Sequence, residues 1–326
     1  MASDGLDLNK TSARDESVQG VPVSVVIPTY CREQVLVETI EYMLGQHPSA
    51  GEIIVVDQTP AHDEDVELQL SQWAAANRIR WIRLETASIP NAMNQGLLHA
   101  EHDVVLFLDD DIEAGPSLVG RHYRHYVDPG VLGVVGQVLQ PGQGPAEGED
   151  DHPRGEGLTR DLEFPFNGTC RCSVLNCMAG NLSVRRNKAL EAGGMDLNFI
   201  GIAYRFETEF CRRLIRLSGQ VMFDPEASIR HLQAPSGGTR AYGDALRSAS
   251  PLHGVGDYYF AIREGRSGYE VGRYFMARLV KSLGRRAYLA EPWWLPVKLV
   301  GEVRAMLLAV RLGAGPQRLI RQGTCD

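Results

Sequence analysis

The chain has 326 residues, enough for one sizeable domain with an appendage or for two small domains. Its composition, 44% hydrophobic and 23% charged, is that of a globular protein. The formal net charge of −8 argues against general binding to nucleic acid, whose phosphates attract basic surfaces.

Residues 1–20 are polar and charged and lack the apolar segment of a signal peptide, so we expect a disordered tail. No apolar run approaches the length of a membrane span. The six cysteines are scattered without a Cys-x-x-Cys pair, which favours buried thiols in a reducing compartment. The expected location is therefore cytoplasmic.

From residue 21 onward, short apolar runs alternate with segments of helical spacing. The predicted strands are 23–27, 53–56, 79–84, 104–108 and 131–138, and the predicted helices are 34–44, 65–76, 91–100 and 117–127. This alternation predicts an α/β fold, in which a mostly parallel sheet has helices on both faces. The chain contains neither a Gly-x-Gly-x-x-Gly loop after the first strand nor a P-loop.

The second half of the chain begins with a long loop at 141–168, rich in Gly, Pro, Asp and Glu. Loops of this length inside compact domains are usually functional or disordered. Order is expected to resume over 172–185. Helices at 188–192 and 207–218 and a strand at 220–224 follow.

The segment 104–112 holds five apolar residues followed by Asp109, Asp110 and Asp111. The apolar run predicts a strand buried on both faces, and the carboxylates must then lie where that strand emerges from the sheet. In open α/β sheets ligands bind at this carboxyl edge. Carboxylate oxygens suit Mg²⁺ or Mn²⁺ bridging to phosphates, and a solvated acidic turn is the alternative.

Polar groups also follow the first and second predicted strands, as Pro28-Thr29-Tyr30 and as Asp57. In a parallel sheet these tips share one edge with the aspartates. Thr29, Tyr30 and Asp57 would then hold a base and ribose, and the aspartates a diphosphate through a cation. Each tip alone would be an ordinary turn.

A series of motifs gives a more specific indication. They are Val-Ser-Val-Val-Ile-Pro-Thr-Tyr at 23–30, Ile-Ile-Val-Val-Asp at 53–57, Asn-Gln-Gly-Leu at 94–97, Leu-Phe-Leu-Asp-Asp-Asp at 106–111, Gly-Asn-Leu-Ser-Val-Arg-Arg at 180–186, Gly-Gly-Met-Asp at 193–196, Glu-Thr-Glu-Phe-Cys-Arg-Arg-Leu at 207–214 and Arg-His-Leu at 230–232. Their order resembles the nucleotide-sugar glycosyltransferases of the GT-A fold, in particular the mostly inverting family two. The resemblance covers residues 23–232.

The resemblance implies a site for a nucleoside diphosphate sugar and for Mg²⁺ or Mn²⁺. Asp109 and Asp111 match an Asp-x-Asp pair, with Asp111 the direct metal ligand, and His231 matches a histidine beside the metal or diphosphate. A hydrogen-bonded structural histidine is the alternative for His231. The implied donor-binding residues are Pro28, Thr29, Tyr30, Asp57, Asn94, Asp109, Asp110, Gly180 and Asn181.

The acceptor end departs from the family pattern. Phe206 replaces the first acid of the usual motif, so Glu207 falls at the position of the catalytic base and Glu209 is the reserve candidate. A structural cap at the helix start is the alternative for Glu207, and Asp196 is the base to consider next. Met93 stands where many relatives carry an arginine.

Residues 241–326 form a predicted basic, amphipathic, helical region after the catalytic domain at 21–240. Residues 261–326 contain twelve Lys and Arg and five Asp and Glu, a balance of +7. Basic helices at 269–286 and 297–312, with Trp293-Trp294, suit an anionic membrane surface on the inner face of the membrane. Packing of these helices on protein is the alternative.

We therefore expect a metal-dependent, inverting transferase that moves a sugar to an acceptor hydroxyl, in bacterial polysaccharide or glycoconjugate synthesis. The acceptor would be a glycan, a lipid-linked molecule or a small molecule. A degenerate nucleotide-sugar-binding protein and a sugar-phosphate nucleotidyltransferase are the alternatives, although the latter requires a Gly-rich basic loop that 28–34 lacks. The sequence leaves the donor, the linkage and the oligomeric state open.

Overall fold

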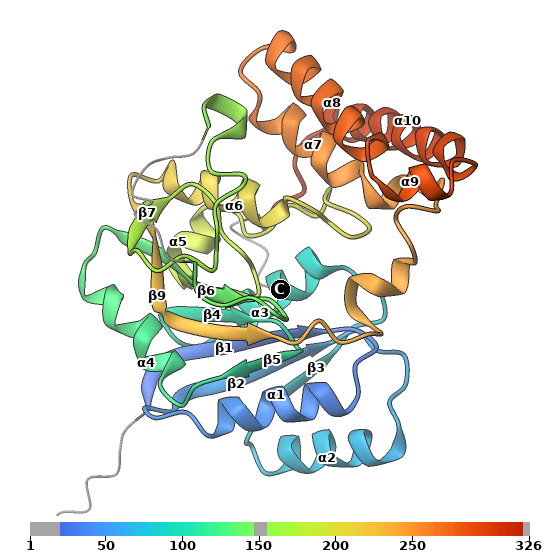
Figure 1. Ribbon diagram of the computed structural model, residues 1–326. Helices are drawn as coiled ribbons and strands as arrows, with labels where there is room; N and C mark the ends of the chain where they lie inside the picture. The colour runs from blue at the N-terminus through green and yellow to red at the C-terminus, as the bar shows by residue number, and fades with distance from the viewer. Residues whose placement is uncertain (1–19, 147–154, 322–326) are drawn as a thin grey trace, which may run out of the picture.

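The computed structural model of the protein describes residues 20–146 and 155–321. The predicted tail, apart from Gly20, and part of the predicted long loop lie outside these ranges. The described residues form a layered α/β domain around one sheet, with a helical region at its C-terminal end (Figure 1).

The described sheet has nine strands, in the order β3-β2-β1-β4-β8-β6-β9-β5, with β7 paired to β9. The strands are β1 (Val21–Thr29), β2 (Ala50–Asp57), β3 (Arg80–Arg83), β4 (Val104–Leu108), β5 (Ile112–Ala114), β6 (Val131–Leu139), β7 (Cys172–Val174), β8 (Asn181–Arg185) and β9 (Gln220–His231). Strands β1–β4, β6 and β9 share one direction, and β5, β7 and β8 oppose it. The predicted α/β architecture with a mostly parallel sheet is confirmed.

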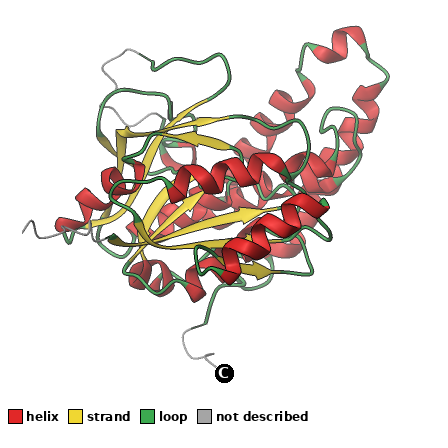
Figure 2. Ribbon diagram, turned by 90° about the horizontal axis from the view of Figure 1, so that it is seen from below, coloured by secondary structure: helices red, strands yellow, loops and turns green. Residues whose placement is uncertain are grey.

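Helices cover both faces of the sheet, which explains the continuous apolar runs of its central strands (Figures 1 and 2). They are α1 (Gln34–Leu44), α2 (Glu64–Ala75), α3 (Ile89–His99), α4 (Leu118–Tyr123), α5 (Arg186–Glu191) and α6 (Phe206–Ile215). Successive side chains of a strand point to opposite faces. In β4, Leu106 packs into the core beneath α1, α2 and α4, whereas Phe107 packs into the core beneath α3 and α6.

Several elements differ from the predictions. Strand β9 continues through Pro225 to His231, beyond the predicted end at Asp224, and the three-residue strands β5 and β7 were not predicted. The predicted helix at 117–127 divides into α4 and a 3₁₀ turn at Arg124–Val127. The short strands escape sequence patterns because three residues show no periodicity.

The C-terminal region is helical, as predicted. It consists of α7 (Val255–Glu264), α8 (Gly268–Leu283), α9 (Ala287–Ala290) and α10 (Trp294–Gly313). Helix α7 was not recognised in the sequence because its first seven residues are all buried, so it shows no polar face. No helix in the described ranges is long and apolar enough to cross a membrane.

After α10 the chain returns to the catalytic domain. The Ile320 amide donates to the Gly193 carbonyl (2.8 Å), and the Arg318 amide donates to Asp196 Oδ1 (2.9 Å). The helical region is therefore attached to the catalytic domain at both ends.

Candidate active site

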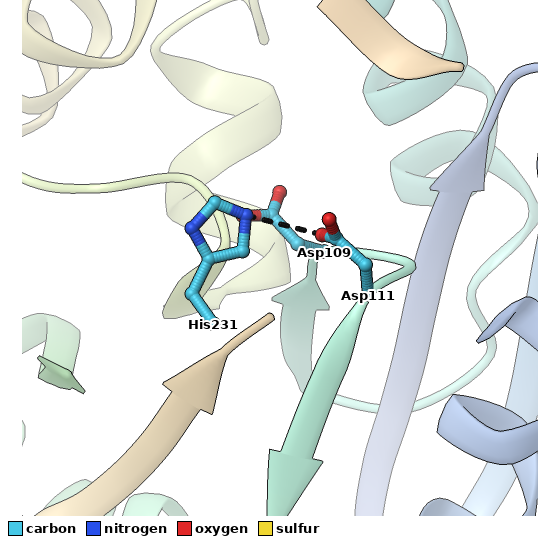
Figure 3. A group of neighbouring side chains, drawn as sticks. All are labelled: Asp109, Asp111 and His231. Carbon is cyan, nitrogen blue, oxygen red and sulfur yellow. Dashed lines mark ion pairs between the residues drawn. The ribbon is translucent and has the colours of Figure 1, made fainter. Parts of the chain in front are cut away.

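The three aspartates lie where the sequence placed them, at the carboxyl end of β4. Strand β5 begins at Ile112 and pairs with the end of β9, with Ile112 opposite His231. This pairing brings His231 Nε2 to 3.1 Å from Asp111 Oδ1 and 3.8 Å from Asp109 Oδ2 (Figure 3). One ligand atom from each of the three residues lies within 4.8 Å of the other two.

The surroundings orient these three side chains. Asp111 Oδ2 accepts hydrogen bonds from the Ala234 amide (2.8 Å) and from Arg32 Nη2 (3.2 Å), which turns Oδ1 towards His231. His231 Nδ1 lies 3.0 Å from Gln140 Oε1, which only accepts, so Nδ1 donates to it, and the protonated imidazole also donates from Nε2 to Asp111. His231 Nε2 thus faces the two carboxylates.

The site favours a positive charge among its groups. Burial would lower the pKa of His231, but its hydrogen bond to Asp111 and the charge of Asp109 raise it. The pKa of the Asp109 carboxyl is raised by burial and by the nearby Asp111 carboxylate. Two carboxylate oxygens and one imidazole nitrogen form a donor set that fits Mn²⁺ or Mg²⁺, and protein groups hold the other polar atoms of Asp111 and His231.

Asp110 points into the protein rather than towards this group. Its carboxylate accepts a hydrogen bond from Thr29 Oγ1 (2.7 Å) and one from Arg32 Nε (3.2 Å). Burial and the neighbouring aspartates nevertheless raise its pKa to about 7. Asp110 therefore joins the tips of β1 and β4 instead of completing the candidate metal site.

A cavity of about 370 Å³ opens beside the aspartates. It is lined by Pro28, Thr29, Tyr30, Arg32, Gln58, Ile89, Met93, Leu108, Asp109, Asp110, Asp111, Ala179, His231, Gln233, Gly238, Thr239 and Arg240. We call it the donor cavity. Met93 contributes an apolar wall, and the positive charge comes from Arg32 and Arg240.

Four predicted donor-binding residues lie outside this cavity, and in three of them protein groups occupy the polar atoms of the side chain. The carboxylate of Asp57 accepts from the Thr59 amide, His62 and Trp81 at 2.8–3.0 Å. The side-chain amide of Asn94 pairs with the backbone of Met195. The side-chain amide of Asn181 donates to two backbone carbonyls and accepts from His122.

Gly180 has a different part in the site. Its carbonyl accepts from the Asp109 amide at 3.2 Å, and a Cβ added at Gly180 would collide with the Asp109 carboxylate. A glycine at this position therefore leaves room for the Asp109 side chain beside β8.

The three candidate bases have different surroundings. Glu209 is buried and binds Arg213 with both oxygens, at 2.6 and 2.8 Å. Asp196 is also buried and accepts from the Tyr259 hydroxyl and from two backbone amides. Glu207, in the first turn of α6, has a buried Oε2 without a hydrogen-bond partner in the described structure.

The surroundings also set the acidity of Glu207. Burial, reinforced by the negative charge of Asp109, raises its pKa to about 7, although its own backbone amide and Arg205 act in the opposite direction. A carboxylate with this pKa accepts a proton from a hydroxyl near neutral pH more readily than an ordinary glutamate. Glu207 therefore combines an oxygen without a hydrogen-bond partner in the described structure with a pKa suited to a base near neutral pH.

Sequence analysis missed Arg32 and Arg240, which supply the positive charge of the donor cavity. Arg32 is 5% exposed and bonds to Asp110, Asp111 and the carbonyls of Ala234 and Ser236. Its position two residues after the Pro-Thr-Tyr tip of β1 was the available signal. Arg240 lies in a 3₁₀ helix, Gly238–Tyr242, that reaches the cavity only through the fold.

Comparisons with known proteins agree with this geometry. Residues 24–192, more than half of the chain, match the family model for glycosyl transferase family 2. Among curated protein sequences there is no significant match.

Solved structures of glycosyltransferases have a similar fold. The mannosyltransferase PcManGT from Pyrobaculum calidifontis, in complex with GDP-Man and Mn²⁺, has a TM-score of 0.54 at 17% identity, over 91% of this chain and 77% of that one. GalNAc-T7 with UDP, GalNAc and Mn²⁺ has a TM-score of 0.53 at 16% identity, over 84% of this chain and 57% of that one.

S. aureus TarS, residues 1–349, has a TM-score of 0.56 at 12% identity, over 87% of this chain and 80% of that one. These likenesses establish the GT-A fold. With the family match over residues 24–192, they show that the chain belongs to glycosyl transferase family 2.

Proposed function

We propose that the protein transfers a sugar from a nucleoside diphosphate donor to an acceptor hydroxyl, with a divalent metal and with inversion at the anomeric carbon. The observation that supports this most directly is the pairing of two features. The Asp109–Asp111–His231 group lies at the sheet edge, and Glu207, with an oxygen free, lies near enough for the charge of Asp109 to raise its pKa.

Donor binding is assigned to the donor cavity. Asp109, Asp111 and His231 hold the metal, which neutralises the departing diphosphate when it is bound. Arg32 keeps Asp111 in position and Arg240 adds a positive charge for the phosphates. Tyr30 offers a ring to the base. The histidine in the set favours Mn²⁺ over Mg²⁺.

Glu207 is proposed to accept the proton of the acceptor hydroxyl. Its position at the start of α6 fixes the carboxylate, and its pKa of about 7 matches the task at neutral pH. A single in-line displacement, with the base on the acceptor side and the diphosphate leaving from the other, inverts the anomeric carbon. Because Phe206 replaces the first acid of the usual motif, Glu207 is left as the carboxylate that accepts this proton.

The donor proposal is tested by a thermal-shift panel of nucleoside diphosphate sugars, with and without Mn²⁺. Ligands that bind only the folded state raise its stability, by about 2.7 kcal/mol at a concentration of 100 times Kd. One donor class should stand out, and only with the metal present. Equal shifts for all nucleotides, or a shift independent of Mn²⁺, would count against the proposal.

We also propose that the helical region attaches to an anionic membrane surface. Along α10, Leu299, Val303 and Leu307 are exposed at helical spacing, at 43, 45 and 66%, and Val310 continues the row. Exposed basic residues, including Arg304 and Arg311, flank this face. Apolar side chains bordered by arginines suit a surface of anionic headgroups, and a lipid-linked acceptor would then be within reach.

A further inference from the structure

A second cavity, of about 650 Å³, lies between α8 and the catalytic domain. Its lining comes from four separate segments of the chain: Leu158, Thr159, Leu162 and Glu163; Ile202, Tyr204 and Arg205; His253 and Asp257; and Glu270, Arg273, Tyr274, Ala277, Arg278, Lys281 and Arg285. We call it the interdomain cavity. Most of its lining residues lie outside the segment that matches the family model, so it is a feature of this chain's C-terminal region.

The acidic residues of the interdomain cavity are all engaged by protein groups. Glu163 pairs with Lys281 (3.0 Å), and Asp257 pairs with Arg278 (2.5 Å). Glu270 accepts the backbone amide of Leu158, at 2.7 Å, and that of Arg266.

Two basic residues of the same cavity are not held in close ion pairs, although Arg273 lies near enough to Glu270 for their charges to interact. Arg273 and Arg285 make no ion pair and no side-chain hydrogen bond in the described structure, and both are exposed at the rim. With five Lys and Arg against three Asp and Glu, the lining has an excess of positive charge.

Arg205 adds a buried positive group. Arg205 is 8% exposed, and its Nη1 donates to the Leu162 carbonyl (3.0 Å). Its guanidinium forms ion pairs with Asp257 (3.5 Å) and Glu163 (3.9 Å), but Nε has no hydrogen-bond partner in the described structure. Its backbone has a φ of +73°, a left-handed conformation that is unfavourable for a residue with a Cβ. An unsatisfied buried guanidinium on a strained backbone marks a place where the fold holds a charge for a ligand.

The interdomain cavity lies close to Glu207, because Arg205, which lines the cavity, is the N-cap residue of α6, two positions before Glu207. Arg205, which lines the interdomain cavity, and Asp109, which lines the donor cavity, both act on the pKa of Glu207. Helix α6, which carries Glu207, lies between the sheet and the C-terminal helices (Figure 1). An acceptor in the interdomain cavity would therefore lie beside the start of α6, where Glu207 is.

We propose that the interdomain cavity binds the acceptor, and that the acceptor carries a phosphate group. This inference rests on the proposed transfer reaction. Arginine is suited to phosphate because its planar fork donates two parallel hydrogen bonds, and Arg205, Arg273 and Arg285 have donors to spare. The Tyr204 and Tyr274 rings and the apolar side chains of Leu158, Leu162 and Ala277 offer contacts to the rest of the acceptor.

The first test measures binding of inorganic phosphate to the full-length protein by calorimetry, in the presence of Mn²⁺ and a saturating nucleoside diphosphate that fills the donor cavity. R273Q and R285Q should each weaken phosphate binding about tenfold, the effect of losing one charge-assisted contact of about 1.4 kcal/mol. R78Q removes an exposed arginine between α2 and β3, outside the cavity, and should leave binding unchanged.

The proposal is wrong if phosphate fails to bind, if R273Q and R285Q bind it as the unmodified protein does, or if the nucleotide displaces it. This titration requires no turnover, so it gives an answer even if the thermal-shift panel finds no donor. Failure of the donor panel and failure of the acceptor site are therefore separate results.

The second test compares two acceptor sources in a transfer assay with the donor that the panel identifies. One source is a soluble sugar phosphate, and the other is a long-chain lipid phosphate in detergent. R273Q and R285Q should raise KM for the accepted source about tenfold with a smaller change in kcat, because the arginines position the phosphate and lie away from the reacting hydroxyl. Transfer to neutral glycans alone would overturn the proposal.

Discussion

Arg32 Nη2 lies 3.2 Å from Asp111 Oδ2, and both side chains are almost fully buried. The guanidinium therefore takes one oxygen of the carboxylate and leaves the other to face His231, where the candidate metal site is. It also compensates the charge of Asp110, so three adjacent aspartates can share one strand end.

The first prediction concerns Asp111. Asp111→Asn keeps the shape of the side chain but removes the negative oxygen that faces His231. Losing a hydrogen-bond partner of a metal ligand typically costs about 10–100-fold in metal affinity or activity. Transfer and Mn²⁺-dependent donor binding should fall by more than this, because the substitution changes a ligand itself. The far-UV circular dichroism should be unchanged. Full activity in the variant, or full activity of the unmodified protein in a chelator, would exclude a metal at this group.

The second prediction separates Glu207 from Glu209. Glu207→Gln should lower the transfer rate by about 10²–10⁴-fold, the usual contribution of a general base, while donor affinity changes little. Glu209→Gln should mainly lower stability, on the order of 3 kcal/mol, because it leaves the buried Arg213 without its charged partner. Rate assays and thermal unfolding on both variants measure these effects.

If Glu209→Gln loses the rate and keeps its stability, Glu209 is the base. If both variants keep the rate, the start of α6 is only structural. Asp196 is then an unfavourable substitute, because its carboxylate is buried and already accepts three hydrogen bonds.

The third prediction concerns pH. Because the deprotonated form of Glu207 acts as the base, kcat should rise with pH through about 7 and then level off. Glu207→Gln should remove this ascending limb. A profile that rises near pH 4.5, the ordinary value for a glutamate, would place the base in a solvated environment.

The same pKa has a consequence for stability. The folded protein binds the Glu207 proton more tightly than the unfolded chain does. The contribution of this proton to the free energy of unfolding is therefore fully present below about pH 4.5 and is lost as pH rises through about 7. The loss is on the order of 3 kcal/mol for a rise from 4.5 to about 7. Glu207→Gln should therefore be more stable than the unmodified protein above pH 7, as measured by denaturant unfolding.

The fourth prediction concerns the membrane surface. The protein should sediment with anionic vesicles at low salt and be released as salt rises, because screening shortens the reach of its arginines. Leu307→Glu should weaken this binding about tenfold, since it replaces an apolar contact by a like charge. Val127→Glu, at an 88% exposed position outside the C-terminal helices, is the matched control.

Equal binding to neutral and anionic vesicles would exclude an electrostatic attachment. Failure to bind either kind would indicate that the exposed row of α10 contacts protein instead.

The fold could be predicted where apolar periodicity extends over a whole element. Helix α1 and strand β4 begin and end where the pattern places them, at Gln34–Leu44 and Val104–Leu108. The full length of strand β9 could not be predicted, because a proline such as Pro225 usually marks the end of a strand. The strand continues to His231 because it pairs with β5 and β6. Helix α7 was hidden by its burial, since a helix enclosed on all sides lacks an amphipathic pattern.

The candidate site was predictable where its residues follow one strand, as Asp109 and Asp111 do. Sequence could not show that the amide of Asn94 would be used by the backbone of Met195, about 100 positions away. Nor could it show that Arg32 would reach two aspartates across the sheet edge. Such contacts are set by tertiary packing, which no local motif records.

The return of the chain after α10 has a consequence for how the helical region can be studied. Gln317 Nε2 donates to Glu209 Oε1 (2.8 Å), so a residue near the C-terminal end helps to hold the helix that carries Glu207. Deleting the chain from residue 261 would withdraw this bond together with those from Arg318 and Ile320. Loss of activity in a shortened protein would thus reflect the loss of hydrogen bonds that hold α6 and its surroundings, rather than the loss of membrane attachment. Single substitutions on α10 test membrane attachment without removing these bonds.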